Sequence, residues 1–209
     1  MSRCVILSAA PVSDAPALRE YLRSNDVFIA ADGGWKLAEA LGVPLTAIVA
    51  DFDSSSQPCL SDAVEIVRLP VRKDCTDTAA AVAYARSKGF TDFLLLGCVG
   101  GRLDHQYAAI QLIAQLAKDG CHAEIVDGDN RISVIASSPH IAQPIKDWSL
   151  SLFAFGGPVH GLTIRGAAYE LNDYDLQPAD PLCVSNVAET APCEITFTDG
   201  MLLMFRSKD

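Results

Sequence analysis

The stretch Ala47-Ile48-Val49-Ala50, followed at once by Asp51-Phe52-Asp53-Ser54, decides the interpretation of this sequence. An uninterrupted apolar run is typical of a strand buried on both faces of a parallel sheet. A strand that ends in two closely spaced carboxylates places them at one edge of the sheet, where a hard cation such as Mg²⁺ can hold both. We expect a metal site there; the alternative is a surface turn in which an aspartate caps a helix.

Outward from this stretch, strand-like and helix-like segments alternate from the N-terminus to about residue 136. The expected strands are 4–8, 27–31, 47–50, 64–69, 92–97, 121–126 and 131–136. The expected helices are 15–23, 35–41, 76–88 and 104–118. Apolar strands separated by helices predict an α/β fold, with a mostly parallel sheet covered by helices on both faces.

The pattern changes after about Pro139. Short β-prone runs are expected at 150–155, 162–165, 182–187, 194–198 and 201–205. Asn172-Asp173 is expected to form a turn, and Asp199-Gly200 to form a hairpin between its flanking strands. These signals predict a small all-β sandwich after a linker near 137–147. We place the domains at 1–138, with nucleotide and metal binding, and 146–209.

A second acidic cluster, Asp74-Cys75-Thr76-Asp77, opens an alanine-rich helix. Thr76 has the character of an N-cap, and Asp77 alone is explained by the preference for acidic residues in a first helical turn. Taken with Asp51 and Asp53, however, Asp77 becomes a candidate third metal ligand. Lys73 precedes the cluster and could offset phosphate charge, although a solvated surface position explains it equally well.

A third cluster runs from Gly97 to His105 and contains Gly100, Gly101, Arg102 and Asp104. Glycines let backbone N–H groups approach a phosphate, and an arginine offers paired hydrogen bonds to phosphate oxygens. Asp104 either caps the following helix or takes part in the reaction. Together with the weaker Asp32-Gly33-Gly34 signal, these clusters indicate phosphoryl-type chemistry assisted by Mg²⁺.

The composition of the chain argues against several other classes of protein. The 209 residues carry a formal net charge of −10, which argues against a general nucleic-acid-binding protein. The seven cysteines are scattered, without a C-x-x-C pair, as expected for reduced thiols in the cytoplasm. We expect no membrane partner, because no run approaches the roughly 20 apolar residues of a membrane span.

Taken in series, the clusters resemble the thiamine pyrophosphokinase family. The motifs of that family occur in the order A-D-G-G, G-D-x-D-S, K-D-x-T-D and G-x-x-G-G-R-x-D-H, followed by S-N in a small β domain. This chain carries matching residues in order over essentially its whole length: 31–34, 51–54, 73–77, 97–105 and Ser185-Asn186. It departs from the pattern at Ala50, Ala79 and Ala109, where glycine, glutamate and asparagine are common.

The resemblance implies an α/β domain followed by a β-sandwich domain that binds thiamine and forms a homodimer. It also implies a diphosphokinase that transfers a pyrophosphoryl group from ATP to thiamine, with Mg²⁺ as cofactor and AMP as product. By similarity, Asp51, Asp53 and Asp77 hold the metal, while Arg102 and Asp104 complete the catalytic set. Ligand contacts are implied for Asp32, Gly33, Lys73, Asp74, Thr76, Gly100, Gly101, Ser185 and Asn186. Tyr169 and Trp148 are weaker candidates for an aromatic wall beside the thiazolium ring.

Two alternatives stay open on the sequence alone. Asp51-Phe52-Asp53 is also the pattern of haloacid-dehalogenase-like phosphatases, although there it follows the first strand rather than the third. A thiamine- or nucleotide-binding protein that has lost catalysis would keep the same pocket residues.

Overall fold

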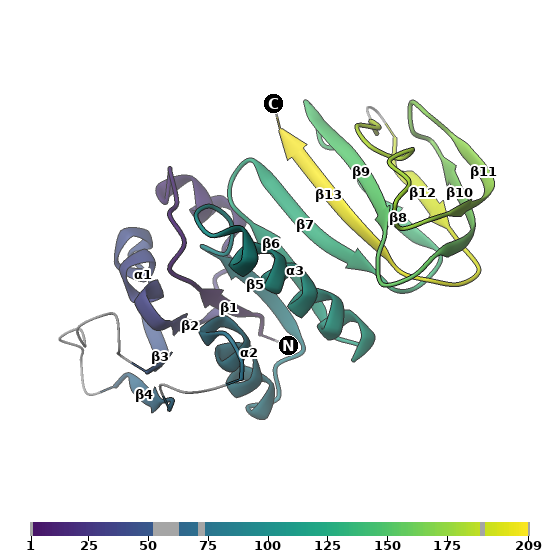
Figure 1. Ribbon diagram of the computed structural model, residues 1–209. Coiled ribbons are helices and arrows are strands. Elements are labelled where there is room, and N and C mark those ends of the chain that lie inside the picture. Colours follow the sequence, from purple (N-terminus) through teal and green to yellow (C-terminus); the bar gives the residue numbers. More distant parts are fainter. Residues whose placement is uncertain (1, 52–62, 71–73, 189–190, 209) are drawn as a thin grey trace. The chain divides into compact units, whose positions relative to one another are not determined.

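A computed structural model describes residues 2–51, 63–70, 74–188 and 191–208 (Figure 1). The chain divides into two units, Met1–Gly128 and Asp129–Asp209. The predicted site residues Asp53 and Lys73 lie outside the described residues. None of the helices in the described part of the chain is both long and apolar enough to cross a membrane.

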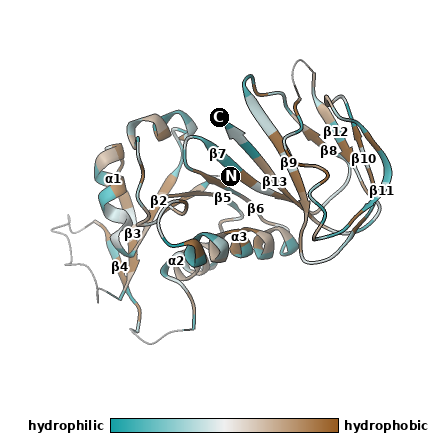
Figure 2. Ribbon diagram, turned by 45° about the horizontal axis from the view of Figure 1, so that its top comes forward, coloured by the Kyte–Doolittle hydropathy of each residue, from teal (hydrophilic) through white to brown (hydrophobic). Residues whose placement is uncertain are grey.

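The first unit contains a parallel sheet in the order β4-β3-β2-β1-β5-β6. Its strands are β1 (Cys4–Leu7), β2 (Val27–Ala31), β3 (Leu45–Ala50), β4 (Glu65–Arg68), β5 (Asp92–Leu96) and β6 (His122–Val126). All four residues of β1 are fully buried, as expected for a central strand covered on both faces. In Figure 2 the hydrophobic colouring follows the strands of this sheet. The predicted parallel α/β architecture is confirmed.

Helices cover both faces of this sheet. They are η1 (Pro16–Tyr21), η2 (Asp32–Gly34), α1 (Trp35–Leu41), α2 (Asp77–Ser87) and α3 (Leu103–Lys118). η1 and α1 pack on one face, against residues of β1 and β5, while α2 and α3 contact the sheet from the opposite face (Figure 2). The segment expected as a helix over 15–23 forms the shorter 3₁₀ helix η1, with Pro16 at its first position.

The ends of the helices follow from local chemistry. The Thr76 hydroxyl accepts a hydrogen bond from the Ala79 backbone N–H at 3.2 Å, so Thr76 is the N-cap that the sequence predicts. α1 ends at Gly42, whose left-handed backbone (φ 64°) lets its N–H bond back to the helix carbonyls. These caps fix where α2 begins and where the chain turns from α1 into β3.

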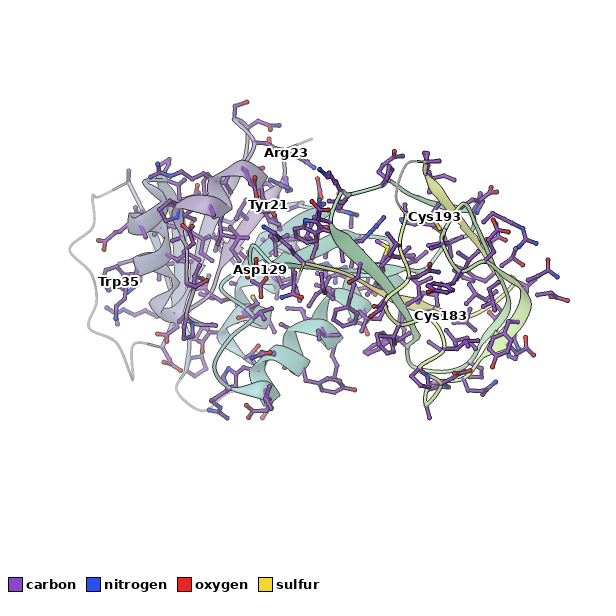
Figure 3. The ribbon with its side chains drawn as sticks, turned by 90° about the horizontal axis from the view of Figure 1, so that it is seen from above. Tyr21, Arg23, Trp35, Asp129, Cys183 and Cys193 are labelled. Atoms are coloured by element: carbon purple, nitrogen blue, oxygen red, sulfur yellow. The ribbon has the colours of Figure 1, made fainter. Side chains whose placement is uncertain are left out.

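The second unit is all β and has two sheets, β7-β13-β9 and β11-β10-β12-β8. Its strands are β7 (Asn130–Ile135), β8 (His140–Ala142), β9 (Trp148–Ala154), β10 (Val159–Arg165), β11 (Leu171–Leu176), β12 (Cys193–Thr196) and β13 (Leu202–Lys208). One apolar cluster draws residues from both sheets, which makes the unit a sandwich. Cys183 and Cys193 lie in this core as unpaired thiols (Figure 3).

Three local expectations for the second unit are wrong. Asn172 and Asp173 belong to β11 rather than to a turn, since the left-handed backbone of Asp173 (φ 47°) is accommodated inside the strand, where the pairing of β10 with β11 is irregular. Residues 182–187 form turns with a single bridge from Asn186 to Leu150, since Pro181 and the left-handed Ser185 (φ 57°) interrupt an extended run.

The third is Asp199-Gly200, which does not close a hairpin. β12 pairs with β10 and β8, whereas β13 pairs with β7 and β9, so this turn carries the chain from one sheet to the other.

The expected linker at 137–147 also contains structure. His140–Ala142 forms β8, which pairs with β12, and β7 pairs with β13 inside the second unit. The division between the two units therefore falls ten residues before the expected boundary at residue 138. A periodicity argument cannot tell an antiparallel strand such as β7 from the parallel strands before it.

Candidate active site

The strand order alone indicates where a ligand binds in this sheet. From β1 the chain moves outward through β2, β3 and β4, then returns through α2 to β5 on the other side of β1. The loops after β1 and β5 therefore diverge, and such a switch point at the carboxyl ends of parallel strands is where open α/β sheets bind ligands.

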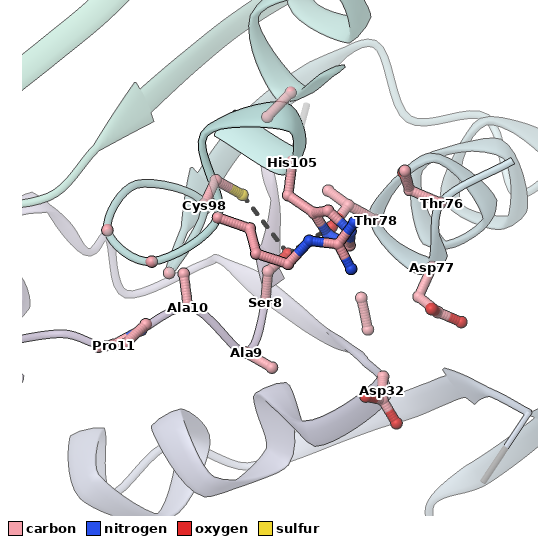
Figure 4. Close-up of a pocket in the computed structure, with 16 residues that line it drawn as sticks. Ser8, Ala9, Ala10, Pro11, Asp32, Thr76, Asp77, Thr78, Cys98 and His105 are labelled. Carbon is pink, nitrogen blue, oxygen red and sulfur yellow. Dashed lines mark hydrogen bonds between the residues drawn. The ribbon is translucent and has the colours of Figure 1, made fainter. Parts of the chain in front are cut away.

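A cavity of about 270 Å³ occupies this position (Figure 4). Its wall combines the loop after β1, the end of β2, the first turn of α2, the loop after β5 and the start of α3. The lining residues are Ser8, Ala9, Ala10, Pro11, Ala31, Asp32, Thr76, Asp77, Thr78, Gly97, Cys98, Gly100, Gly101, Arg102, His105 and Ala109. Four segments that are far apart in the sequence, 8–11, 31–32, 76–78 and 97–109, thus meet at one site.

Six of the predicted site residues line this cavity: Asp32, Thr76, Asp77, Gly100, Gly101 and Arg102. Figure 4 shows the carboxylates of Asp32 and Asp77 on the same side of the pocket. Asp32 has a left-handed backbone (φ 45°), a conformation that costs energy and that is tolerated most easily by Asp, Asn and Gly. Asp32 and Asp77 therefore line the same cavity, whereas convergence of the two acidic clusters at 51–54 and 74–77 stays a prediction.

Four other predicted residues are described but lie outside the lining: Gly33, Asp51, Asp74 and Asp104. Asp51 is half-buried directly after β3, and Asp74 is exposed before α2. The Asp104 carboxylate instead pairs with Arg102, at 2.6 Å between Oδ2 and Nη2 and 3.1 Å between Oδ1 and Nε. Both side chains are largely exposed, so this ion pair lies at the rim.

The pairing sets the protonation state of Asp104. Hydrogen bonds from the Arg102 guanidinium lower the pKa of the Asp104 carboxyl to about 2, and raise the pKa of Arg102. A general base works best with a pKa near the working pH. In this arrangement Asp104 is therefore a weak proton acceptor, and its carboxylate hydrogen-bonds the Arg102 guanidinium.

The glycines of the motifs first serve close packing. A Cβ on Gly34 would come within 1.9 Å of the Leu7 carbonyl oxygen, so the end of β2 can approach β1 only without a side chain. Gly100 has φ 91° and would bring a Cβ within 2.9 Å of the Pro11 carbonyl oxygen. Both contacts hold the two sides of the switch point together.

Sequence reasoning missed one side of the site. Ser8, Ala9, Ala10 and Pro11 contain no motif, yet the whole loop lines the cavity because β1 is adjacent to β5. His105, which ends the third cluster and was not named among the expected site residues, lines the cavity as well. The available signal was topological, since the loop after the first strand of such a sheet borders the switch point.

The cavity offers carboxylate oxygens to a metal ion. Within the described residues, no three His, Cys, Asp or Glu side chains lie together so as to hold a metal ion. Mg²⁺, however, usually takes only one or two carboxylates, with substrate phosphates and water completing its shell. The carboxylates of Asp32 and Asp77 on one cavity wall fit that mode of binding.

The two predicted residues of the second unit have different environments. Ser185 is exposed, and its backbone N–H donates to the Ser151 hydroxyl at 3.0 Å. Asn186 is buried: its Oδ1 accepts from the backbone N–H of Tyr169 at 3.0 Å, and its Nδ2 donates to the Tyr169 carbonyl at 2.7 Å. Asn186 therefore anchors the backbone of Tyr169, a residue that is 73% exposed.

The fold and the cavity define a class, that of doubly wound α/β proteins with an acidic, arginine-containing pocket at the switch point and a following all-β unit. Two family models match the chain: thiamin pyrophosphokinase, catalytic domain, over residues 18–125, and thiamin pyrophosphokinase, vitamin B1 binding domain, over residues 140–202. The chain belongs to the thiamine pyrophosphokinase family.

Individual relatives agree with this assignment. The chain is 28% identical to the thiamine pyrophosphokinase of Bacillus subtilis over 210 residues, which cover 98% of each chain. The solved structure of a Bacillus subtilis thiamine pyrophosphokinase matches with a TM-score of 0.90 at 24% identity and complete coverage of both chains. That of the Candida albicans enzyme matches at 14% identity with a TM-score of 0.77, covering 100% of this chain and 89% of the other. These structures show that the fold is shared.

Proposed function

We propose that this chain is a thiamine diphosphokinase, which transfers a pyrophosphoryl group from ATP to thiamine and releases AMP. The observation that carries the proposal is that both family domains match in order, while six motif residues of the catalytic domain line one cavity at the switch point. The hydroxyethyl oxygen of thiamine attacks the β-phosphorus of ATP. The bond from that phosphorus to the oxygen shared with the α-phosphate breaks, its electron pair leaves with AMP, and the hydroxyl proton is lost.

Most of the work of such a site is positioning and charge stabilisation. Arg102 at the rim can form paired hydrogen bonds to phosphate oxygens, while Asp104 keeps its guanidinium oriented until the nucleotide binds. Gly100 and Gly101 leave the backbone of the loop accessible to the phosphates. Gly33, Lys73, Asp74 and Thr76 stay proposed contacts of the same ligand.

We further propose Mg²⁺ as the metal, held by Asp51, Asp53 and Asp77 together with phosphate oxygens. When bound, the ion would neutralise phosphate charge and hold the triphosphate in line with the attacking hydroxyl. The support is the chemistry of the donors, since carboxylate oxygens are the hard ligands that Mg²⁺ prefers. Asp77 lies on the cavity wall, and Asp32 beside it supplies a further carboxylate to the same side.

The second unit is proposed to bind thiamine through Ser185, Asn186 and the exposed ring of Tyr169. An aromatic face attracts a cation such as the thiazolium ring. The hydrogen bonds between the Asn186 side chain and the Tyr169 backbone fix the loop that carries this ring.

We also propose that the protein forms a homodimer. Exposed apolar side chains on the second unit, including Leu182 and Val184, are consistent with such an interface.

A cytoplasmic location is proposed from the cysteines, because the six that the structure describes are all unpaired. The phosphatase alternative is disfavoured by topology: Asp51 follows β3, whereas that class carries its aspartate pair after the first strand.

A direct test of the proposed reaction uses Arg102→Lys. This variant keeps the positive charge but loses the planar guanidinium, and it should lower kcat/KM for ATP by about tenfold or more. An unchanged kcat/KM would place Arg102 outside the reaction.

A further inference from the structure

Three side chains at the base of the cavity form a chain of hydrogen bonds that no part of the proposed chemistry yet uses. The Cys98 thiol donates to the Ser8 hydroxyl at 3.4 Å, and the Ser8 and Thr78 hydroxyl oxygens lie 2.8 Å apart (Figure 4). The three residues come from the loops after β1 and β5 and from the first turn of α2. All three line the cavity.

The thiol at the inner end of this chain stays protonated. Cys98 is 6% exposed, and burial raises the pKa of its thiol to about 11. The Leu96 carbonyl is a second possible acceptor for the thiol proton, but it lies at 3.9 Å, and the Ser8 oxygen is nearer. Cys98 is therefore a fixed donor to Ser8, and it cannot serve as a nucleophile at neutral pH.

Counting protons shows that one donor is left over. The thiol and the two hydroxyls carry three protons, and the chain contains two hydrogen bonds. If Ser8 donates to Thr78, the Thr78 proton is unused; if Thr78 donates to Ser8, the Ser8 proton is unused. Within the described residues neither hydroxyl has another acceptor. In both cases the spare O–H belongs to a residue of the cavity wall.

We infer that Ser8, which accepts from the Cys98 thiol, donates its own proton to Thr78, and that the Thr78 hydroxyl then donates a hydrogen bond to a phosphate oxygen of the bound nucleotide. This inference rests on the proposed function for the identity of the ligand. The acceptor is a phosphate because Thr78 follows Asp77 in the first turn of α2 and lines the same cavity as Arg102 and the glycines of the loop after β5. Phosphate oxygens are the strongest acceptors among the proposed substrates, and a donor that is fixed before binding loses little entropy on binding.

The test compares Thr78→Val, which replaces the hydroxyl by a methyl group of similar shape, with Thr78→Ser, which keeps the hydroxyl. Thr46→Val, an exposed threonine of β3, controls for the substitution itself. Calorimetry with inorganic tripolyphosphate and Mg²⁺ measures binding without turnover. We expect Thr78→Val to weaken this binding by about tenfold or more, as for the loss of a hydrogen bond to a charged group, while Thr78→Ser and Thr46→Val stay within about threefold of the wild type.

Steady-state kinetics give a second readout. Thr78→Val should raise KM for ATP by a similar factor and leave KM for thiamine within about twofold. Ser8→Ala should weaken tripolyphosphate binding in the same direction. The double variant should bind no more weakly than Thr78→Val alone, because both residues act through one chain.

The inference is overturned if Thr78→Val binds tripolyphosphate like the wild type, if Thr78→Ser loses as much as Thr78→Val, or if only KM for thiamine changes. A wild-type protein that forms no thiamine diphosphate would instead contradict the proposed function. The calorimetric comparison would still decide whether the Thr78 hydroxyl contacts phosphate.

Discussion

At the rim of the cavity, Arg102 and Asp104 hold each other in an ion pair that is open to solvent. An exposed pair of this kind adds little to folding stability, because water screens it. The effect of the ion pair is geometric, since it holds the Arg102 guanidinium in one orientation beside the loop after β5. Asp77 differs, because it lines the cavity and carries a carboxylate of the kind that a hard cation prefers.

At the residue scale, Asp77→Asn should lower kcat by roughly a hundredfold or more, since changes even behind a metal ligand typically cost tenfold to a hundredfold. The amide keeps the size of the side chain, so the thermal midpoint should change little. Titrating activity with Mg²⁺ checks the assignment: the variant should need far more metal. Wild-type activity with an unchanged Mg²⁺ requirement would remove Asp77 from the metal site.

The protonation state of Asp104 gives a pH prediction. Its pKa in the folded chain is about 2, lower than that of an unperturbed aspartate, so the ion pair with Arg102 is complete at neutral pH and is lost only as the pH falls toward 2. Asp104→Asn should therefore leave the shape of the pH profile of kcat/KM unchanged above pH ~5. An acid limb between about pH 5 and 7 that disappears in this variant would show that Asp104 titrates as the base.

At the element scale, the site depends on how closely β1, β2 and β5 approach one another at their carboxyl ends. Gly34 lies where the turn after β2 touches the Leu7 carbonyl, and Gly97, with φ 67°, would place a Cβ 2.4 Å from the Ser8 carbonyl oxygen. Backbone atoms cannot move aside as a flexible side chain can. The glycines therefore shape the cavity before any ligand contact is considered.

Gly34→Ala should destabilise the protein by about 1–3 kcal/mol or more, because the added methyl group overlaps backbone. Urea denaturation measures the change. Gly157→Ala is the matched control, since a Cβ there meets no atom within 4 Å, and it should be nearly neutral. Equal stabilities for the two variants would mean that β1 and the turn after β2 are not packed as closely as described.

The sequence predicted elements well where a single rule governed them. Buried apolar runs gave the parallel strands, and Thr76 and Gly42 gave the helix ends. The predictions failed where strand pairing in the folded chain, rather than local sequence, determined the structure. Asp173 is left-handed inside a strand, and Asp199-Gly200 joins two sheets instead of closing a hairpin. Turn chemistry specifies local backbone angles but not the partner of the next strand.

At the scale of the whole molecule, the motifs predicted that Asp32, Asp77 and Arg102 belong to one site, but they assigned no role to Ser8, Thr78 or Cys98. Those three share no pattern, and they meet because β1 is adjacent to β5 and α2 packs against β1. Strand order is set by packing over the whole sheet, so a motif search along the sequence cannot recover it.

Assembly is also a property at this scale. The exposed side chains of Leu182 and Val184 on the second unit, and of Leu103 and Tyr107 on α3, suit burial against a second copy. We expect light scattering at micromolar concentration to give twice the chain mass of 22.3 kDa. A monomer across the concentrations used for catalysis would contradict the proposed homodimer, without affecting the assignment of the cavity.

The most direct test of the central claim is incubation of the purified protein with ATP, Mg²⁺ and thiamine, followed by separation of the products. The structure and the family predict thiamine diphosphate and AMP in equal amounts, and neither product without thiamine. Release of ADP or inorganic phosphate instead, or binding of both substrates with no AMP formed under any metal condition, would contradict pyrophosphoryl transfer at this site.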